Sequence, residues 1–119
     1  MIDLAKLRAD IQQEVSEYPV PPPRDPAAVG SALSAEWFEQ GLAEMREALV
    51  DPYVTDAVWF DHLTQQRVSR PVAVVADDQG AHVVALDLEG DEFELFFRSD
   101  DALHSMNVRG DAVGCFLAR

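Results

Sequence analysis

The chain has 119 residues, 48% hydrophobic and 26% charged, a balance that excludes disorder of the whole chain and allows one domain with its own core. Its net charge of −13, from 22 acidic and 9 basic residues, disfavours binding to nucleic acid or to an anionic membrane surface, because like charges repel. The single cysteine, Cys115, excludes an internal disulfide and a cysteine-based metal cluster, and its apolar neighbours predict a buried, inert thiol.

The first residues, MIDLAKLRAD, lack the basic and apolar regions of a signal peptide and the length of a membrane span, so we expect a cytoplasmic protein. They begin an amphipathic helix predicted over residues 3–17, with Asp3 as its N-cap. Its apolar side chains recur at spacings of three and four residues, at Leu4, Leu7, Ile11 and Val15. We expect this narrow stripe to dock on the domain itself, with docking on a partner as the alternative.

Residues 18–31 are rich in proline and predict a linker rather than a helix or a central strand. An extended polyproline conformation would carry the first helix across the body of the domain, which spans residues 32–119. Pro19, Pro22 and Arg24 also match a pattern that SH3-type grooves bind, but such a pattern arises easily by chance in a proline run.

A second helix is predicted over residues 35–50, with Ser34 as its N-cap and a hydrophobic staple between Leu33 and Phe38. The buried stripe of this helix is Phe38, Leu42, Met45 and Leu49. Gly41 lies beside the stripe, where the absence of a side chain allows close packing. Asp51 and Pro52 are expected to end the helix, because the residue before a proline resists the helical conformation.

Residues 53–69 are compatible with a strand or with a third helix that starts at Asp51 and Pro52. Their β-branched and aromatic content favours a strand over residues 54–62, followed by a turn or a fraying strand end at residues 64–69.

Residues 70–98 hold three further predicted strands, at 72–76, 81–88 and 92–98, with turns at 77–80 and 89–91. The middle strand is apolar on both faces, which predicts a central position covered by helices on at least one side. The last strand alternates, so Phe93, Leu95 and Phe97 are expected to point inward. Its outward side chains are then Glu92, Glu94, Phe96 and Arg98, among which Phe96 would be an exposed apolar anchor.

The C-terminal part predicts a short helix over residues 100–106, a turn over residues 107–111 and a last strand over residues 112–117. Ser99 and two following acids are typical of a helix start. Together the elements predict one α+β domain over residues 1–119, in which two N-terminal helices pack on a mostly antiparallel sheet of about five strands.

The sequence predicts no catalytic residue and no bound metal or cofactor. The three histidines, His62, His82 and His104, lie about twenty residues apart and lack the local spacing of zinc ligands. Glu92 and Glu94 share a strand face, which acid–base chemistry or a hard cation could use, but an ordinary solvated face is the simpler interpretation. We therefore expect a protein that is not an enzyme.

The leading hypothesis is a small acidic intracellular protein that recognises a basic protein partner. Immunity proteins, antitoxins and secretion chaperones share this physical character, although no motif links the chain to them. The residues predicted to bind the partner surround the turn at 89–91; they are Asp87, Glu89, Asp91, Glu92, Glu94 and Phe96.

Two alternatives remain open at this stage. One is a small-ligand or metal-dependent enzyme with a pocket between helix and sheet, in which His82 or His62 approaches carboxylates. The other is a structural domain that associates with itself through the N-terminal helix and the proline-rich arm. The sequence leaves the oligomeric state open, with a homodimer among the allowed states.

Overall fold

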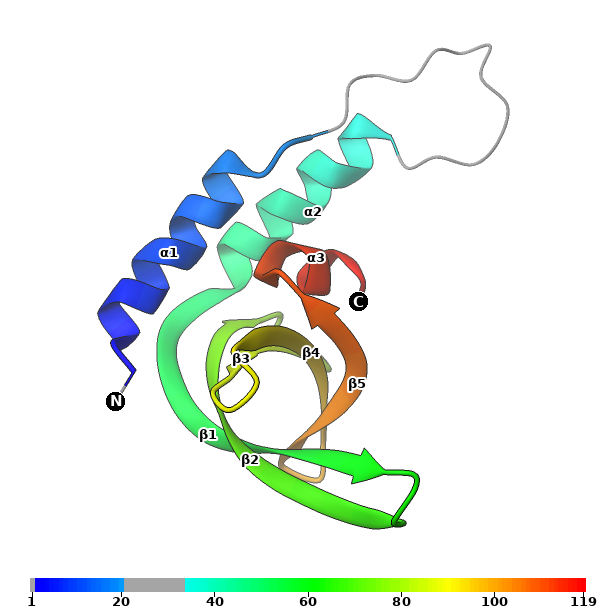
Figure 1. Cartoon of the computed structure of the whole chain (residues 1–119). Coiled ribbons are helices and arrows are strands. Elements are labelled where there is room, and N and C mark those ends of the chain that lie inside the picture. The colour runs from blue at the N-terminus through cyan, green and yellow to red at the C-terminus, as the bar shows by residue number, and fades with distance from the viewer. Residues whose placement is uncertain (1, 21–33) are drawn as a thin grey trace.

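A computed structural model describes residues 2–20 and 34–119, which form an α+β fold (Figure 1). In this part of the chain two helices precede five strands, and a short helix follows them. The elements are α1 (Leu4–Glu17), α2 (Ala35–Ala48), β1 (Leu49–Asp61), β2 (Gln66–Asp77), β3 (His82–Asp87), β4 (Glu92–Ser99), β5 (Ala102–Gly110) and α3 (Ala112–Leu117). None of the described helices combines the length and the apolar character that a membrane span requires.

The five strands close into a barrel in which each strand pairs with the next one along the chain. These pairings are antiparallel, whereas β5 returns to β1 through a short parallel contact that places Ala57 opposite Leu103 and Val58 opposite His104. The predicted α+β class and the mostly antiparallel five-stranded sheet are therefore confirmed. Closure into a barrel was not predicted, and it gives the sheet a second buried side.

The barrel separates two hydrophobic cores. The inner core receives side chains from all five strands: Ala57, Trp59, Val72, Val74, Val83, Ala85, Phe96 and Leu103. The outer core lies between the barrel wall and the three helices, which gather on one side of the barrel in Figure 1. Strands β2, β3 and β4 contribute to both cores because successive side chains on a strand point to opposite faces.

The helix predictions hold at their N-terminal ends. Asp3 caps α1 by accepting a hydrogen bond from Lys6 N at 3.0 Å, and Ser34 caps α2 by accepting one from Trp37 N at 3.1 Å. The stripe of α1 is buried in the outer core at Leu7, Ile11 and Val15, so it docks on its own domain as expected. The staple residue Leu33 and most of the predicted linker lie outside the described residues.

Gly41 brings α2 close to α3. A side chain at this position would overlap Leu117, so the close packing expected at Gly41 is present. The C-terminal end of α2 differs from the prediction, since the helix ends at Ala48 and β1 begins at once with Leu49. Asp51 and Pro52 lie inside β1, at a register shift between β1 and β2 where a proline without an N–H is tolerated.

The strand predicted for residues 54–62 is confirmed as part of β1, and β2 begins at Gln66, within the stretch expected to be a turn. The C-terminal predictions, by contrast, are wrong. Residues 100–106 are not a helix, because Asp100 and Asp101 adopt φ angles of 53° and 61° and make a tight turn from β4 into β5.

The helix start lies instead at Asp111, whose side chain accepts a hydrogen bond from Gly114 N at 2.6 Å. The apolar run at residues 112–117 is therefore α3 and not a strand, and residues 107–110 belong to β5 rather than to a turn. Cys115 on α3 is buried, as predicted. Burial, together with nearby carboxylates, raises the pKa of its thiol to about 12, which keeps the thiol protonated and inert at neutral pH.

Helices α1 and α3 are joined by Glu14, whose carboxylate accepts a hydrogen bond from Val113 N at 2.7 Å. Burial raises the pKa of the Glu14 carboxyl; the hydrogen bond opposes this shift and the charge of Asp111 adds to it. A raised pKa in the folded state stabilises the fold below the unfolded-state pKa, and that contribution is lost as the pH rises through the folded-state pKa.

Replacing Glu14 with glutamine should therefore raise the free energy of unfolding at neutral pH, by about 0.5 kcal/mol. Glutamine still accepts the hydrogen bond from Val113 N but carries no charge beside Asp111. Near about pH 4 the difference should shrink, because wild-type Glu14 is then largely protonated. Urea unfolding of both proteins at the two pH values measures the difference in their free energies of unfolding. The same difference at both pH values would contradict the prediction.

Candidate functional site

The acids predicted to bind a partner are largely bound to arginines of the same chain. Arg70 Nη2 lies 2.7 Å from Asp87 Oδ2, and Arg70 Nε lies 3.9 Å from Glu89. Asp87 is fully buried and also accepts a hydrogen bond from Glu89 N at 3.1 Å. Arg70 in turn stacks over the ring of Trp59, at 4.1 Å from its centre, so Asp87 is part of the barrel interior.

Glu94 is likewise fully buried and paired. Arg109 Nε lies 2.7 Å from Glu94 Oε1, and Ser105 Oγ donates a hydrogen bond to the other carboxylate oxygen. Arg109 also reaches the exposed Glu92, at 3.8 Å. Glu92 and Glu94 thus share one arginine, which neutralises half of the charge on the face that was expected to attract a basic partner.

Phe96 is not the exposed anchor that the alternation of β4 predicted. It is fully buried in the inner core, where its ring packs edge-to-face on Trp59 at 5.3 Å. Phe97, expected to point inward, is 39% exposed and stacks on His104. The barrel causes this reversal: Glu94 and Phe96 point inside it, and Leu95 points into the outer core.

Of the six residues predicted to bind a partner, Asp87, Glu94 and Phe96 are therefore buried. The other three, Glu89, Asp91 and Glu92, are exposed at the turn between β3 and β4. The prediction that a partner binds at this turn can now rest only on the exposed acids.

A more concave surface lies where the C-terminal residues meet α2. One hollow of about 540 Å³ is lined by Glu36, Trp37, Gln40, Gly41 and Glu44 of α2 and by Phe116, Leu117 and Arg119. A second hollow of about 390 Å³ is lined by Glu44, Glu47, Asp77, Asp78, Phe116 and Arg119, among others. We call these two hollows together the α2–α3 groove; they meet at Glu44, Phe116 and Arg119.

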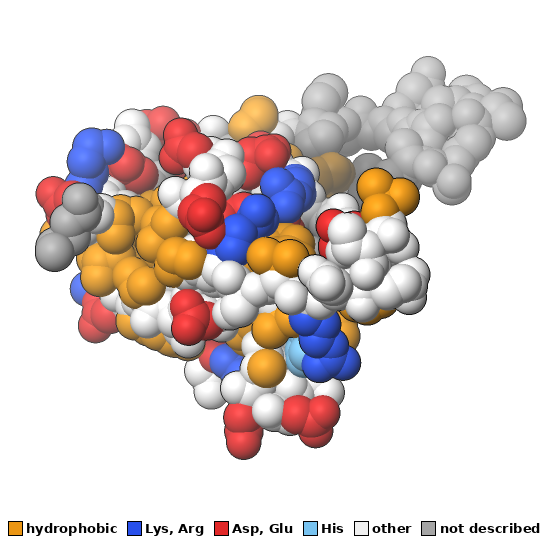
Figure 2. Space-filling model, turned by 60° about the horizontal axis from the view of Figure 1, so that its bottom comes forward, with side chains coloured by type: hydrophobic (Ala, Val, Ile, Leu, Met, Phe, Trp, Pro, Cys, Tyr) orange, Lys and Arg blue, Asp and Glu red, His pale blue; other side chains and the backbone are white. Residues whose placement is uncertain are grey.

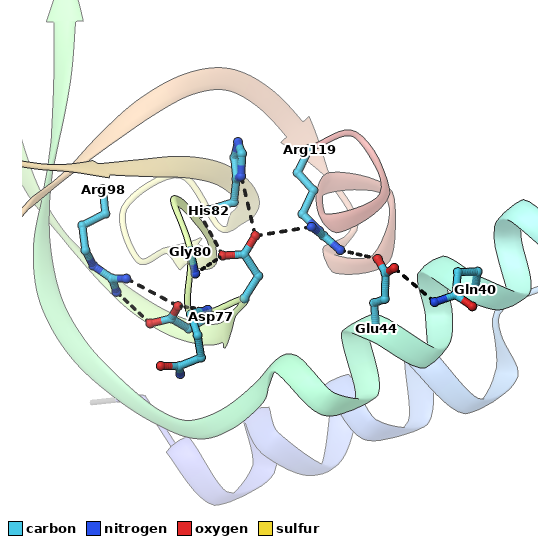
Figure 3. A network of polar contacts seen from close by, with 9 residues as sticks. Gln40, Glu44, Asp77, Gly80, His82, Arg98 and Arg119 are labelled. Atoms are coloured by element: carbon cyan, nitrogen blue, oxygen red, sulfur yellow. Dashed lines mark hydrogen bonds and ion pairs between the residues drawn. The ribbon is translucent and has the colours of Figure 1, made fainter.

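Arg119 lies between the two hollows and is held by three groups; Figure 3 draws its two ion pairs. Its Nη2 is 2.5 Å from Glu44 Oε2, and its Nη1 is 3.3 Å from Asp78 Oδ2. The guanidinium also stacks over the ring of Phe116, 4.1 Å from its centre. Arg119 thus connects α2 to the turn between β2 and β3.

The two carboxylates that bind Arg119 are also fixed by other contacts. Gln40 Nε2 donates to Glu44 Oε1 at 3.2 Å, one helical turn away on α2. Asp78 Oδ1 accepts hydrogen bonds from Gly80 N at 2.8 Å and His82 N at 3.2 Å within the turn. These contacts do not involve Arg119, so they orient both carboxylates independently of it (Figure 3).

Asp77, next to Asp78, forms a paired contact with Arg98, with Asp77 Oδ2 at 2.7 Å from Arg98 Nη2. The hydrogen bonds from Arg98 hold the pKa of Asp77 below its usual range, against the effect of burial. Asp77 is therefore ionised and neutralised within the chain. The remaining acids of the groove, Glu36, Glu44, Glu47 and Asp78, face one lining cation, Arg119, among the described residues.

The histidines do not converge on this groove. His82 Nδ1 lies 3.6 Å from Asp78 Oδ2, whereas His62 packs edge-on against Phe60 and His104 stacks on Phe97. Within residues 2–20 and 34–119, no three His, Cys, Asp or Glu side chains are grouped so that they could hold a metal ion.

Most basic side chains of the described residues are already paired with acids. Those in salt bridges are Lys6, Arg8, Arg70, Arg98, Arg109 and Arg119. On the face drawn in Figure 2, Lys and Arg side chains lie beside Asp or Glu side chains, except where they adjoin a histidine. Since few bases remain free to offset the net charge of −13, the unpaired surface charge is mainly acidic.

Comparison with known proteins adds nothing to this geometry: no family model, curated protein or solved structure matches the chain. One signal of the groove was present in the sequence, because Glu36, Gln40 and Glu44 recur every four residues and so share a face of the predicted second helix. The contribution of Asp78 and Arg119 had no local signal, since only the folded chain brings them to that face.

Proposed function

We propose that this protein is a cytoplasmic, non-enzymatic binding protein that recognises a basic protein partner through the α2–α3 groove. The observation that carries the proposal is the combination of several carboxylates with an exposed aromatic residue in one concave surface. Glu36, Glu44 and Glu47 supply the charge, and Trp37, 39% exposed, stands at the groove as a large apolar contact.

This combination suits protein recognition on physical grounds. Tryptophan is among the residues that contribute most binding energy at interfaces, when the partner covers it. Surrounding carboxylates attract a basic partner over a distance of about one Debye length, about 8 Å at physiological salt, and speed its approach. The acids exposed at the β3–β4 turn, Glu89, Asp91 and Glu92, would add to the same attractive field without forming the groove.

The two alternatives have weaker support. For an enzyme, the relevant observation is the approach of His82 to Asp78, but Asp78 is at the same time bound by Arg119. For self-association through the N-terminal helix, the stripe of α1 would have to be free, whereas it is buried against the barrel and the other helices.

The test is to isolate the tagged full-length protein from its host at low salt, identify the protein that accompanies it, and titrate the purified pair. We expect the double variant Glu36→Lys, Glu47→Lys to weaken binding at least about tenfold, because two attractive contacts become repulsive. Trp37→Ala should weaken binding by a similar factor, since it removes the apolar contact.

The matched control is Glu39→Lys together with Glu17→Lys, which makes the same change in net charge at exposed helical positions outside the groove. Its effect on the dissociation constant should be about twofold or less, and it should fall further as salt is raised. If the groove variant and the control lose affinity for the partner equally, or if neither loses affinity, recognition by the groove is refuted.

A further inference from the structure

We infer that Glu44, Asp78 and Phe116 form an arginine-binding subsite of the α2–α3 groove, which Arg119 of the same chain occupies until an arginine of the partner displaces it. The inference rests on the proposed function and specifies the partner's chemistry: an arginine, rather than a lysine, enters at this point.

The contacts of Arg119 use the features that distinguish a guanidinium from an ammonium group. Two different nitrogens reach two carboxylates, Glu44 and Asp78, while the flat face covers Phe116. A planar group with several donors can make these contacts together, whereas the compact, strongly hydrated ammonium of lysine satisfies only some of them. The subsite is therefore selective for arginine by its geometry.

The subsite is formed before any partner arrives. Gln40 orients Glu44, and the backbone N–H groups of Gly80 and His82 orient Asp78. The side chain of Asp78 is only 14% exposed, so its position is also restricted by packing. Because these contacts do not involve Arg119, we expect its departure to leave the two carboxylates in place, so that a second guanidinium binds without reorganising them.

Arg119 is well placed to leave. It follows α3, and its side chain remains 24% exposed at the junction of the two hollows, both of which it lines. An intramolecular guanidinium competes with one from a partner, so it lowers the partner's apparent affinity by the fraction of time for which it occupies the subsite. Removing it should therefore strengthen the binding of arginine.

The experiment titrates tetra-arginine and tetra-lysine peptides into the full-length protein at low salt. The binding is followed by NMR through the indole signal of Trp37 and the amide signals of α2 and α3. We expect Arg119→Gln and Arg119→Ala to bind tetra-arginine about tenfold more tightly than wild type, with a gain of about twofold or less for tetra-lysine. In either background, Glu44→Gln should remove most of the gain.

Arg46→Ala is the matched control, because it removes one positive charge from α2 outside the groove lining. The affinity of this variant for both peptides should rise only slightly, because the protein has become more acidic. The inference is overturned if Arg46→Ala changes the affinity for the peptides as much as the Arg119 variants do, or if the Arg119 variants gain equal affinity for both peptides. It is also overturned if the Arg119 variants gain no affinity for tetra-arginine while their spectra remain those of the folded protein.

The two proposals can fail separately. If Glu36→Lys, Glu47→Lys and Trp37→Ala release the natural partner but the Arg119 variants gain no arginine affinity, the groove is the binding site and Arg119 is only a structural clamp. If the Arg119 variants gain arginine affinity while the natural partner ignores the groove variants, the subsite exists and the partner binds elsewhere.

Discussion

Replacing Phe96 with alanine should lower the free energy of unfolding by about 3–5 kcal/mol, the range for removing a large aromatic side chain from a well-packed core. Phe96 has no exposed surface and lies among residues from all five strands. Its edge-to-face contact with Trp59 adds to the loss. A domain of this size is typically stable by about 5–15 kcal/mol, so this one change removes a large part of the total.

Phe97→Ala provides the control, because the same deletion is made one residue away on β4. Phe97 is 39% exposed and contacts His104 on the outside of the barrel, so its loss should cost about 1 kcal/mol. Urea unfolding followed by tryptophan fluorescence and by circular dichroism gives both values. A larger cost for Phe97→Ala than for Phe96→Ala would mean that the inner and outer faces of β4 are assigned the wrong way round.

The same pair of residues shows what the sequence could and could not determine. Period-two alternation in β4 was recognised correctly, and so was the placement of Leu95 on a buried face. The alternation cannot say how many faces are buried: here closure buries the inner face of β4, and the helices cover part of its outer face, at Leu95. With one buried face assumed, Phe96 and Glu94 were assigned to solvent, because a glutamate on a strand is ordinarily exposed.

Closure of the barrel depends on contacts between residues far apart in the sequence, which leave no local sequence pattern. The parallel contact between β1 and β5 is short, and it joins residues 57–58 to residues 103–104. It also requires the tight turn at Asp100 and Asp101, where two aspartates adopt positive φ. Aspartate favours helix N-terminal turns and left-handed turns alike, so this pair was interpreted as a helix start and β5 was missed.

The candidate site was predictable only in part for the same reason. The face of α2 that carries Glu36, Gln40 and Glu44 follows from helical spacing alone. Its opposite wall is formed by the β2–β3 turn, by Arg119 and by α3, whose residues 112–117 were predicted to be a strand. Arg119 pairs with two carboxylates that are distant from it in the sequence. Its charge alone does not identify which acids of the chain it contacts in the fold.

Replacing Arg109 with alanine should cost about 3–5 kcal/mol, although more than a third of the Arg109 side chain is exposed. The reason lies in its partner: Glu94 is fully buried, and Arg109 Nε at 2.7 Å is the cation that it faces. Without Arg109, the carboxylate keeps the hydrogen bond from Ser105 but loses its charge compensation. An uncompensated charge in the barrel interior is much more costly than the lost attraction of a surface pair.

Arg8→Ala tests this reasoning, because it also breaks an arginine–carboxylate contact. Both partners of that pair, Arg8 and Asp51, are more than half exposed, so its loss should cost less than about 1 kcal/mol. If Glu94 is the origin of the larger cost, adding Glu94→Gln to Arg109→Ala should recover at least half of the lost stability, since the buried charge is then gone. If the double variant is no more stable than Arg109→Ala, Arg109 contributes mainly through packing of its aliphatic stem, and the acids of β4 play no electrostatic part in holding the barrel together.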